Sequence, residues 1–393
     1  MMDQARRDDV LSLTRKLIAQ RSESGHEDGA AQVLRNYLTE QGFDEVRTDE
    51  YGNVIGVLRG NRPGPKLLFD GHLDTVPVRD AATWTHDPYA GELVDGKLYG
   101  RGTSDMKGAV AAYAVAAACF ARDAGRDFAG ELYVDGIVHE ECFEGVASRS
   151  VSASVHPDVV VIGEASDCNV KLGQRGRAEV VVETFGVPAH SANPEKGVNA
   201  VYAMCTVIEA MRKLPCPEHP VLGRGILELT DVISAPYPGA SVVPARCRAT
   251  FDRRLLPGET RESVLAPLHA LVERLAAESG IRAQVSFAAG EERCYTGAVI
   301  RGERFFPGWI YDENEPFVRA VLAELRAAGQ SPEVTHYSFC TNGSHYAGEA
   351  GIPTLGFGPS RENLAHTDDE YVETEELFRA CDGYQAVMKA ILR

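Results

Sequence analysis

The chain has 393 residues, of which 44% are hydrophobic and 25% are charged, and its formal net charge is −17. A chain of this length can bury a large core and favours two domains over one. The acidic balance disfavours nucleic acid and anionic membranes as partners, and no run of about 18 apolar residues predicts a membrane span.

Helices and buried strands alternate along the first part of the chain. The pattern predicts a helix that ends near Gln20 and a second helix from about Glu27 to Gln41. Apolar runs in LLFD, GELYVDGIVHEE and DVVVIGEAS predict buried strands, and an Ala-rich helix is expected from about Lys107 to Arg122. This alternation indicates an α/β fold with a central mixed sheet flanked by helices.

The pattern changes near Arg175, where GRAEVVVETFG alternates as a half-exposed strand does. A helix from Val198 to Lys213, two strands, a helix and a last strand follow, and helix–strand alternation resumes after Tyr311. The order βαββαβ is that of a ferredoxin-like unit. We therefore predict a split catalytic domain, with a smaller domain inserted in it; the boundaries are 1–175 and 296–393 for the former and 176–295 for the latter.

Side chains of the kind that ligate metals recur where the expected strands end. They are His72 and Asp74 after LLFD, Asp105 in the turn YGRGTSD, Glu140 and Glu141 closing IVHEE, Glu164 after VVVI, and His366 in ENLAHTDDEYV. Each alone has an ordinary explanation, since an aspartate before a helix is usually an N-cap and adjacent glutamates are usually solvated. Their recurrence favours a single site, because ligands bind in the crevice beyond the carboxyl ends of the strands of an α/β sheet.

This set has the chemistry of a site for two zinc-like ions, which take imidazole and carboxylate ligands and leave a position for water. If Asp105 bridges the ions, His72 and Glu164 are expected to hold one ion. Glu141 and His366 are then expected to hold the other. Two Zn²⁺ ions, for which Co²⁺ or Mn²⁺ can substitute, can share a hydroxide and polarise a carbonyl group.

Two further acids are expected to act beside the ligands. Glu140, next to a ligand, is free to take the proton of the attacking water and to pass it to the leaving amine. Asp74, two residues after His72, is placed to orient that imidazole. A metal-stabilised protein that only binds amino acids or peptides is the non-enzymatic alternative, and the presence of Glu140 makes it the weaker one.

The succession His-x-Asp, Gly-x-x-Asp-x-Lys-Gly, Glu-Glu, Glu and a late His resembles the signature of the dizinc amidohydrolases and exopeptidases. This family includes acetylornithine deacetylase, succinyl-diaminopimelate desuccinylase, aminoacylase and carboxypeptidase G. The segments GRAEVVVETFGVPAHSANPEKGVNAV and HYSFCTNGSHYAGEAGIPTLGFGPSRENLAHT resemble the branch of YgeY-type hydrolases. The resemblance covers nearly the whole chain, implies the same metal ligands, and implies a cis peptide after Asp105.

The resemblance also implies roles for residues that are not metal ligands. His190 in PAHSANP matches a histidine of the inserted domain that steadies the tetrahedral oxyanion. Arg254 in FDRRLLPGET matches an arginine that binds the substrate carboxylate. A guanidinium group can bind a carboxylate through two parallel hydrogen bonds. Arg253 beside it leaves this assignment open by one position. Asn342 and Gly343 match a loop that contacts the substrate.

The predicted activity is metal-dependent hydrolysis of a C–N amide bond in a small substrate with a free carboxylate, an N-acyl or N-carbamoyl-type amino acid. A dipeptidase or carboxypeptidase needs the same ligand set and is the alternative, since only the pocket on the acyl side differs. Ser241 stands where several relatives carry Asn, so the resemblance does not carry over one particular substrate.

The expected setting of the protein is cytoplasmic. The N-terminal segment has no apolar signal-peptide core. The nine cysteines are scattered without a Cys-x-x-Cys pair, which predicts reduced thiols rather than a disulfide framework. The resemblance implies a homodimer formed through the inserted domain, which is also expected to close over the cleft as a lid.

Overall fold

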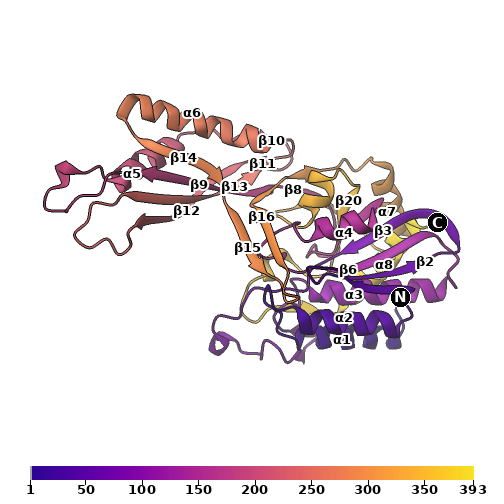
Figure 1. Cartoon of the computed structure of the whole chain (residues 1–393). Helices are drawn as coiled ribbons and strands as arrows, with labels where there is room; N and C mark the ends of the chain where they lie inside the picture. The colour runs from indigo at the N-terminus through magenta and orange to yellow at the C-terminus, as the bar shows by residue number, and fades with distance from the viewer. Residues whose placement is uncertain (1) are drawn as a thin grey trace. The chain divides into compact units, whose positions relative to one another are not determined.

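The structure is a computed structural model that describes residues 2–393 (Figure 1). Two compact units divide the chain. Unit 1 contains residues 2–174, 291–301 and 310–393, and unit 2 contains residues 175–290 and 302–309. None of the helices in residues 2–393 combines the length and the apolar character that a membrane crossing requires.

Unit 1 is built on a nine-stranded mixed sheet. Its strands are β1 (Glu45–Thr48), β2 (Val54–Arg59), β3 (Arg62–Asp70), β6 (Ala129–Gly136), β7 (Val159–Ile162), β8 (Val170–Gln174), β18 (Trp309–Ile310), β19 (Val334–Tyr337) and β20 (Thr354–Gly356). They lie in the order β1-β2-β6-β3-β7-β20-β8-β18, and β19 pairs with β8. β3 runs parallel to both β6 and β7, whereas β2 runs antiparallel to β1 and β6. The predicted α/β fold with a central mixed sheet is confirmed.

The helices of unit 1 include the Ala-rich helix that the sequence predicts. They are α1 (Gln4–Ile18), α2 (Asp28–Glu40), α3 (Lys107–Asp123), α4 (Ser148–Val155), α7 (Pro316–Ala327) and α8 (Thr374–Ile391). α3 packs against α1 and α8, and every residue from Lys107 to Ala121 is buried. Alanine explains this position, because it is the best helix former and its small side chain lets neighbouring helices approach closely.

The parallel strands bring three loops to one edge of the sheet. Phe69 lies opposite Val134, and Asp70 lies opposite Ile162, so β3, β6 and β7 end nearly level with one another. Beyond the strand ends, His72 forms an isolated bridge with Ile137. The loops that begin here carry most of the predicted site.

A second, smaller sheet in unit 1 joins a segment near the C-terminus to the strand that precedes the Asp105 loop. Its strands are β4 (Leu93–Val94), β5 (Lys97–Tyr99) and β21 (Tyr371–Glu373), in the order β21-β5-β4. Tyr371 lies opposite Tyr99 in the antiparallel pair of β21 and β5. The segment that carries His366 therefore runs beside the loop between β5 and α3, which carries Asp105.

Unit 2 has its own sheet and its own core. Its main elements are β9 (Gly176–Phe185), α5 (Ala200–Met211), β12 (Ile226–Ala235), β13 (Arg246–Leu255), α6 (Arg261–Ser279) and β14 (Arg282–Phe287), with the short strands β10 (Glu218–His219), β11 (Gly223–Arg224) and β17 (Phe305–Phe306). The four long strands are antiparallel and lie in the order β12-β13-β9-β14, and β17 pairs with β9. Buried residues such as Val182, Met204, Phe251 and Leu268 fill the core between the helices and the sheet.

The boundary after unit 2 differs from the prediction of a single return near residue 296. The chain enters unit 1 at residue 291, leaves it at residue 302 and enters it again at residue 310. The reason is the hairpin of β15 (Ala289–Arg293) and β16 (Val299–Glu303). At its tip, Tyr295 Oη and Thr296 Oγ1 donate hydrogen bonds to the carbonyl groups of Gly52 (2.8 Å) and Glu50 (2.7 Å), which holds the tip against unit 1.

Candidate active site

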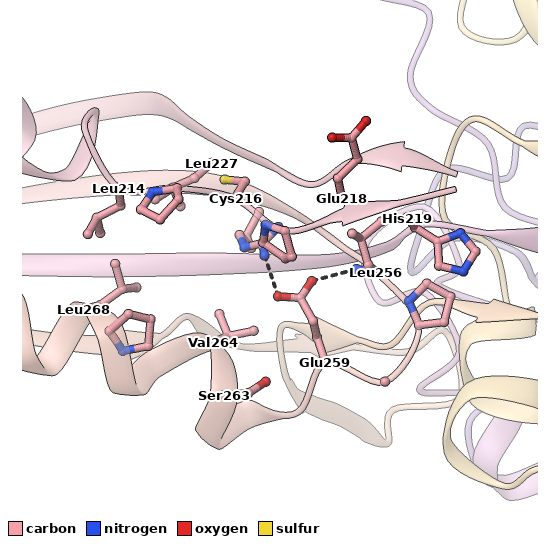
Figure 2. Close-up of a pocket in the computed structure, with 16 residues that line it drawn as sticks. Leu214, Cys216, Glu218, His219, Leu227, Leu256, Glu259, Ser263, Val264 and Leu268 are labelled. Carbon is pink, nitrogen blue, oxygen red and sulfur yellow. Dashed lines mark hydrogen bonds and ion pairs between the residues drawn. The ribbon is translucent and has the colours of Figure 1, made fainter. Parts of the chain in front are cut away.

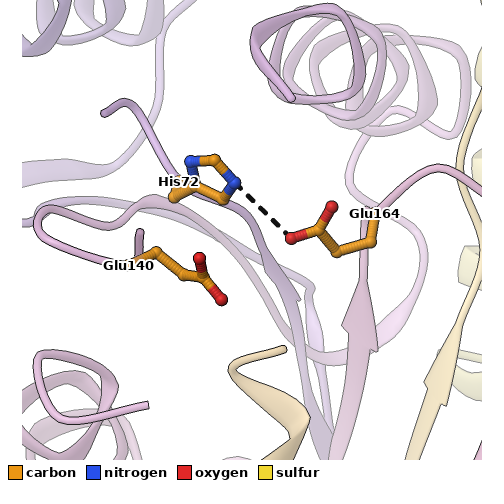
Figure 3. Close-up of side chains that lie close together, drawn as sticks. All are labelled: His72, Glu140 and Glu164. Carbon is orange, nitrogen blue, oxygen red and sulfur yellow. Dashed lines mark ion pairs between the residues drawn. The ribbon is translucent and has the colours of Figure 1, made fainter. Parts of the chain in front are cut away.

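The loops at the edge of the sheet bring the predicted ligands of unit 1 together. Figure 3 shows the side chains of His72, Glu140 and Glu164 turned toward a common space. Ligand atoms of these three residues lie within 4.8 Å of one another, and so do those of His72, Asp105 and Glu141. His72, Glu140 and Glu164 are buried.

Asp105 lies between the two histidines and turns one oxygen toward each. Its Oδ1 is 3.0 Å from His72 Nε2, and its Oδ2 is 3.1 Å from His366 Nε2. On the first side, Glu164 Oε1 is 3.5 Å from His72 Nε2. On the second side, Glu141 Oε2 is 3.0 Å from His366 Nε2. The structure thus brings together the five residues that the sequence predicts as ligands, with Asp105 facing both imidazoles. A cis peptide joins Asp105 to Met106.

Burial and crowding shift the pKa values of these acids. Burial raises the pKa of Glu141 to about 7, and the neighbouring Asp105 carboxylate adds to the rise. Burial likewise raises the pKa of Glu164. Burial alone would raise the pKa of Asp105 too, but hydrogen bonds to His366 and His72 outweigh it and lower the pKa below its usual range.

The two imidazoles lie among the carboxylates, and their pKa values are raised. Hydrogen bonds to Asp105 and Glu141 raise the pKa of His366 to about 10. Burial lowers the pKa of His72, but the hydrogen bonds to Asp105 and Glu164 outweigh burial and raise it well above its usual value. Buried carboxylates this close together need positive charge among them, and imidazole and carboxylate are ligands of zinc-like divalent cations. The residues present therefore fit such cations.

Glu140 differs from the other acids because its Oε1 is buried and has no hydrogen-bond partner within residues 2–393. Burial raises the pKa of Glu140 well above its usual range, and the nearby carboxylates add to the rise whereas His72 opposes it. A carboxylate with an uncommitted oxygen and a raised pKa can accept a proton from a water molecule and release it again near neutral pH.

Asp74 faces His72 with both its backbone carbonyl and its carboxylate. The backbone carbonyl of Asp74 lies 2.9 Å from His72 Nδ1, while its carboxylate Oδ1 lies 3.5 Å from the same nitrogen. A carbonyl can only accept, so Nδ1 carries the proton and Nε2 faces the cluster. The carboxylate accepts the N–H groups of Glu140 and Glu141, each at 3.1 Å, and thus holds the loop of the proposed base.

The loop before α2 supplies supports that the sequence did not indicate. Ser24 Oγ donates to Asp74 Oδ2 at 2.7 Å. Glu27 is fully buried, and its Oε1 accepts the N–H groups of Gly25 (2.9 Å) and His139 (3.1 Å). No local pattern marks these roles, because Ser and Glu before a helix are ordinary capping residues.

Asn342, for which a contact with the substrate is predicted, bonds to the end of a strand and to a loop beside the cluster. Its Nδ2 donates to Asp70 Oδ1 at 2.9 Å, and its Oδ1 accepts Gly145 N–H at 2.8 Å. Its side chain therefore ties the end of β3 to the loop that follows Glu141. The N–H of Gly343 donates to Thr341 Oγ1 at 3.0 Å, so this group also bonds within the protein.

In unit 2, the strand β13 separates the two candidate arginines. Arg253 is 6% exposed and bonds to Glu259 Oε1 (2.5 Å) and to the carbonyl groups of Ile226 and Arg254. Glu259 lies at a pocket of about 560 Å³. Figure 2 shows this pocket with Leu214, Leu227, Val264 and Leu268 on its walls. Because Arg253 is occupied there, it is not available for a substrate carboxylate.

Arg254 points to the opposite face of the sheet of unit 2, since successive residues of a strand alternate. Its Nε donates to Asp252 Oδ2 at 2.7 Å. Within residues 2–393 no bond is found to its two Nη groups, which leaves a guanidinium fork for an anionic ligand.

His190 lies on an exposed turn of unit 2. Its Nδ1 accepts the N–H of Ala192 at 3.0 Å, so the proton resides on Nε2, which can donate. The turn pairs with the segment at Val242, and Ser191 N–H donates to the carbonyl of Ser241 at 3.0 Å. Ser241 has a φ of 56°, a conformation that favours Asn and Gly.

Comparisons with known proteins show the family and the fold. Residues 68–390 match the model of peptidase family M20/M25/M40. The chain is 33% identical over 385 residues to YgeY of Escherichia coli (strain K12), which covers 96% of this chain and 93% of that protein. It is 31% identical over 401 residues to a succinyl-diaminopimelate desuccinylase of Cereibacter sphaeroides, which covers 98% of each. The structure of aminopeptidase PepT from Bacillus cereus has a TM-score of 0.75 over 98% of each chain at 20% identity, and so shares the fold.

The fold and the acid–imidazole cluster define a hydrolase with a candidate metal centre. The chain belongs to peptidase family M20/M25/M40, a family of metal-dependent hydrolases. The resemblance that the motifs indicated, including the similarity to the YgeY branch, is thereby confirmed.

Proposed function

We propose that this protein hydrolyses a C–N amide bond in a small substrate that bears a free carboxylate, an N-acyl or N-carbamoyl-type amino acid. One observation carries the proposal. Glu140, with an uncommitted buried oxygen, adjoins a cluster in which Asp105 faces two imidazole–carboxylate pairs. A protein that only binds its ligand has no need of such a base.

The cluster is proposed to hold two Zn²⁺ ions, for which Co²⁺ or Mn²⁺ can substitute. His72 and Glu164 would hold one ion, Glu141 and His366 the other, and Asp105 both. When bound, such ions act as Lewis acids toward a carbonyl and make hydroxide available at neutral pH.

Residues of the protein transfer the proton of the attacking water and fix the tautomer of the imidazole ligand. Glu140 takes a proton from the attacking water at Oε1 and returns it to the nitrogen that leaves. The carbonyl of Asp74 keeps the proton of His72 on Nδ1, so that Nε2 remains a ligand atom. The carboxylate of Asp74 fixes the backbone of Glu140 and Glu141.

Two residues of unit 2 are proposed to contact the substrate. Arg254 binds the free carboxylate with its Nη groups, and the bond of its Nε to Asp252 orients the fork. His190 donates from Nε2 to the oxyanion of the tetrahedral state. The bond from Ala192 to Nδ1 supports this tautomer.

Substitution of Arg254 by Ala is expected to raise KM for carboxylate substrates by about 10- to 100-fold, the equivalent of a lost charge-assisted hydrogen bond, with a smaller change in kcat. Steady-state kinetics on one N-acyl amino acid measure both constants. The control is Arg248→Ala, an exposed arginine of the same strand. An unchanged KM in the Arg254 variant would move the carboxylate contact elsewhere.

The function itself is tested with a panel of N-acetyl, N-succinyl and N-carbamoyl amino acids and dipeptides, assayed before and after chelation. Faster hydrolysis of the acylated compounds is expected, and the succinyl-diaminopimelate desuccinylase among the relatives supports this choice. Chelation is expected to abolish turnover, and added Zn²⁺ to restore it. Preference for dipeptides would favour the dipeptidase or carboxypeptidase alternative, and turnover that survives chelation would overturn the metal-dependent mechanism.

We also propose that unit 2 is a ferredoxin-like lid and dimerisation domain. β12 lies at the edge of its sheet, with Val232 45% and Ile233 48% exposed, and an apolar edge strand is a place where a second strand can pair. Sedimentation is expected to give twice the mass of the 42.6 kDa chain.

The cytoplasm is the proposed compartment, because all nine cysteines are free thiols.

A further inference from the structure

The loop that carries Asp105 is bound by one carboxylate from the far end of the chain. Glu370 Oε1 accepts three backbone N–H groups of this loop, those of Gly102 (3.0 Å), Ser104 (2.8 Å) and Asp105 (3.1 Å). Its other oxygen, Oε2, accepts Arg101 Nη1 at 2.6 Å. Four donors from one loop thus converge on a single side chain.

Both charged partners are buried, since Glu370 is 0% and Arg101 is 4% exposed. A buried carboxylate is stable only where donors replace the water it has lost. Gly100 and Gly102 have φ values of 149° and 88°, in the region where glycine is the favoured residue, so the loop has little conformational preference of its own. The shape of the loop therefore depends on an acceptor outside it.

The segment that supplies this acceptor also carries His366. The N–H of Gly100 donates to the backbone carbonyl of Glu370 at 2.8 Å, and the pairing of β21 with β5 continues from there. His366 lies shortly before Glu370, in a segment without regular secondary structure. The positions of Asp105 and His366, which are far apart in the sequence, are thus linked through Glu370.

We propose that Glu370 is a positioning residue that orders the Asp105 loop before any cation binds, so that Asp105 presents Oδ1 to His72 and Oδ2 to His366. This inference rests on the proposed cation-dependent function and adds to it a residue that acts through its neighbours. The half of the site formed by Asp105, Glu141 and His366 depends on it most, because Asp105 bonds directly to Glu370 and His366 belongs to the same segment as Glu370.

The neighbouring residue, Asp369, provides a matched control. Asp369 Oδ1 accepts the N–H groups of Thr85 (2.8 Å) and His86 (3.0 Å), so it braces a loop in the same manner. That loop carries none of the proposed ligands. A general loss of stability should follow from either substitution, whereas a loss of cation affinity should follow only from a change at Glu370.

The test is titration of the metal-free full-length protein with Co²⁺, followed by calorimetry and by the visible absorption of the bound ion. The wild type and Asp369→Asn are expected to bind two equivalents. Glu370→Gln keeps the volume of the side chain but sets an amide N–H against the guanidinium of Arg101. It is expected to bind one of the two equivalents about 10- to 100-fold more weakly, as for other residues that support metal ligands. Wild-type affinity for both equivalents in Glu370→Gln would overturn the proposal, whereas a wild type that binds no Co²⁺ would overturn the proposed function instead.

A second measurement needs no variant and decides the question if Glu370→Gln does not fold. Hydrogen exchange of the chelated wild type is expected to show the amides of Gly102, Ser104 and Asp105 already protected, with little further protection when Co²⁺ is added. Rapid exchange that stops only after Co²⁺ is added would mean that the cation, and not Glu370, orders the loop.

Discussion

Glu140→Gln is expected to lower kcat by about 10²- to 10⁴-fold, because the side chain keeps its size but loses the basic oxygen that accepts a proton from water. Cation content should stay at the wild-type value, since the proposed ligands are intact. Stability should change little or rise, because Glu140 Oε1 has no hydrogen-bond partner to lose and the substitution removes a buried carboxylate.

The experiment measures kcat, bound metal per chain and the thermal midpoint of the same preparation. Glu131→Gln is the control, because Glu131 lies on the same strand, β6, where it bonds to Tyr133 and Arg59 at the other end from the site. A Glu140 variant with kcat close to that of the wild type would remove the proton-transfer role. A large fall in metal content would show that Glu140 is a ligand instead.

Asp105→Asn is expected to abolish turnover for a different reason, because it disturbs both halves of the site at once. An asparagine presents one neutral oxygen and one N–H₂ group, so one of the two imidazoles would face a donor in place of a carboxylate oxygen. Substitutions of residues that only support ligands weaken metal binding by about 10- to 100-fold, and the loss of a shared ligand should exceed that range.

The comparison variant is His366→Ala, which leaves His72, Glu164 and Asp105 Oδ1 together. Titration with Zn²⁺ is expected to find one equivalent retained in His366→Ala and neither retained with useful affinity in Asp105→Asn. Retention of two tight equivalents by Asp105→Asn would contradict the shared position of this carboxylate.

The sheet and most of the cluster could be predicted from the sequence. Apolar runs such as VVVI and LLFD are typical of strands in a sheet that helices cover on both faces. The carboxyl ends of parallel strands lie at the same edge of such a sheet. Side chains that follow those runs, such as His72 and Glu164, therefore meet wherever the strands pair in register. Side chains alternate between the two faces of a sheet along each strand. Once β13 is identified as a strand, it therefore follows that Arg253 and Arg254 point to opposite faces.

The contacts that hold the proposed ligands in place could not be predicted from the sequence. Glu370 sits in an acidic run that alone predicts an exposed loop, and its burial follows from the pairing of β21 with β5. The inward position of Asn342 and the use of the Asp74 carbonyl are contacts of the same kind. Local propensity reaches only a few residues along the chain, whereas these bonds join segments that packing alone brings together.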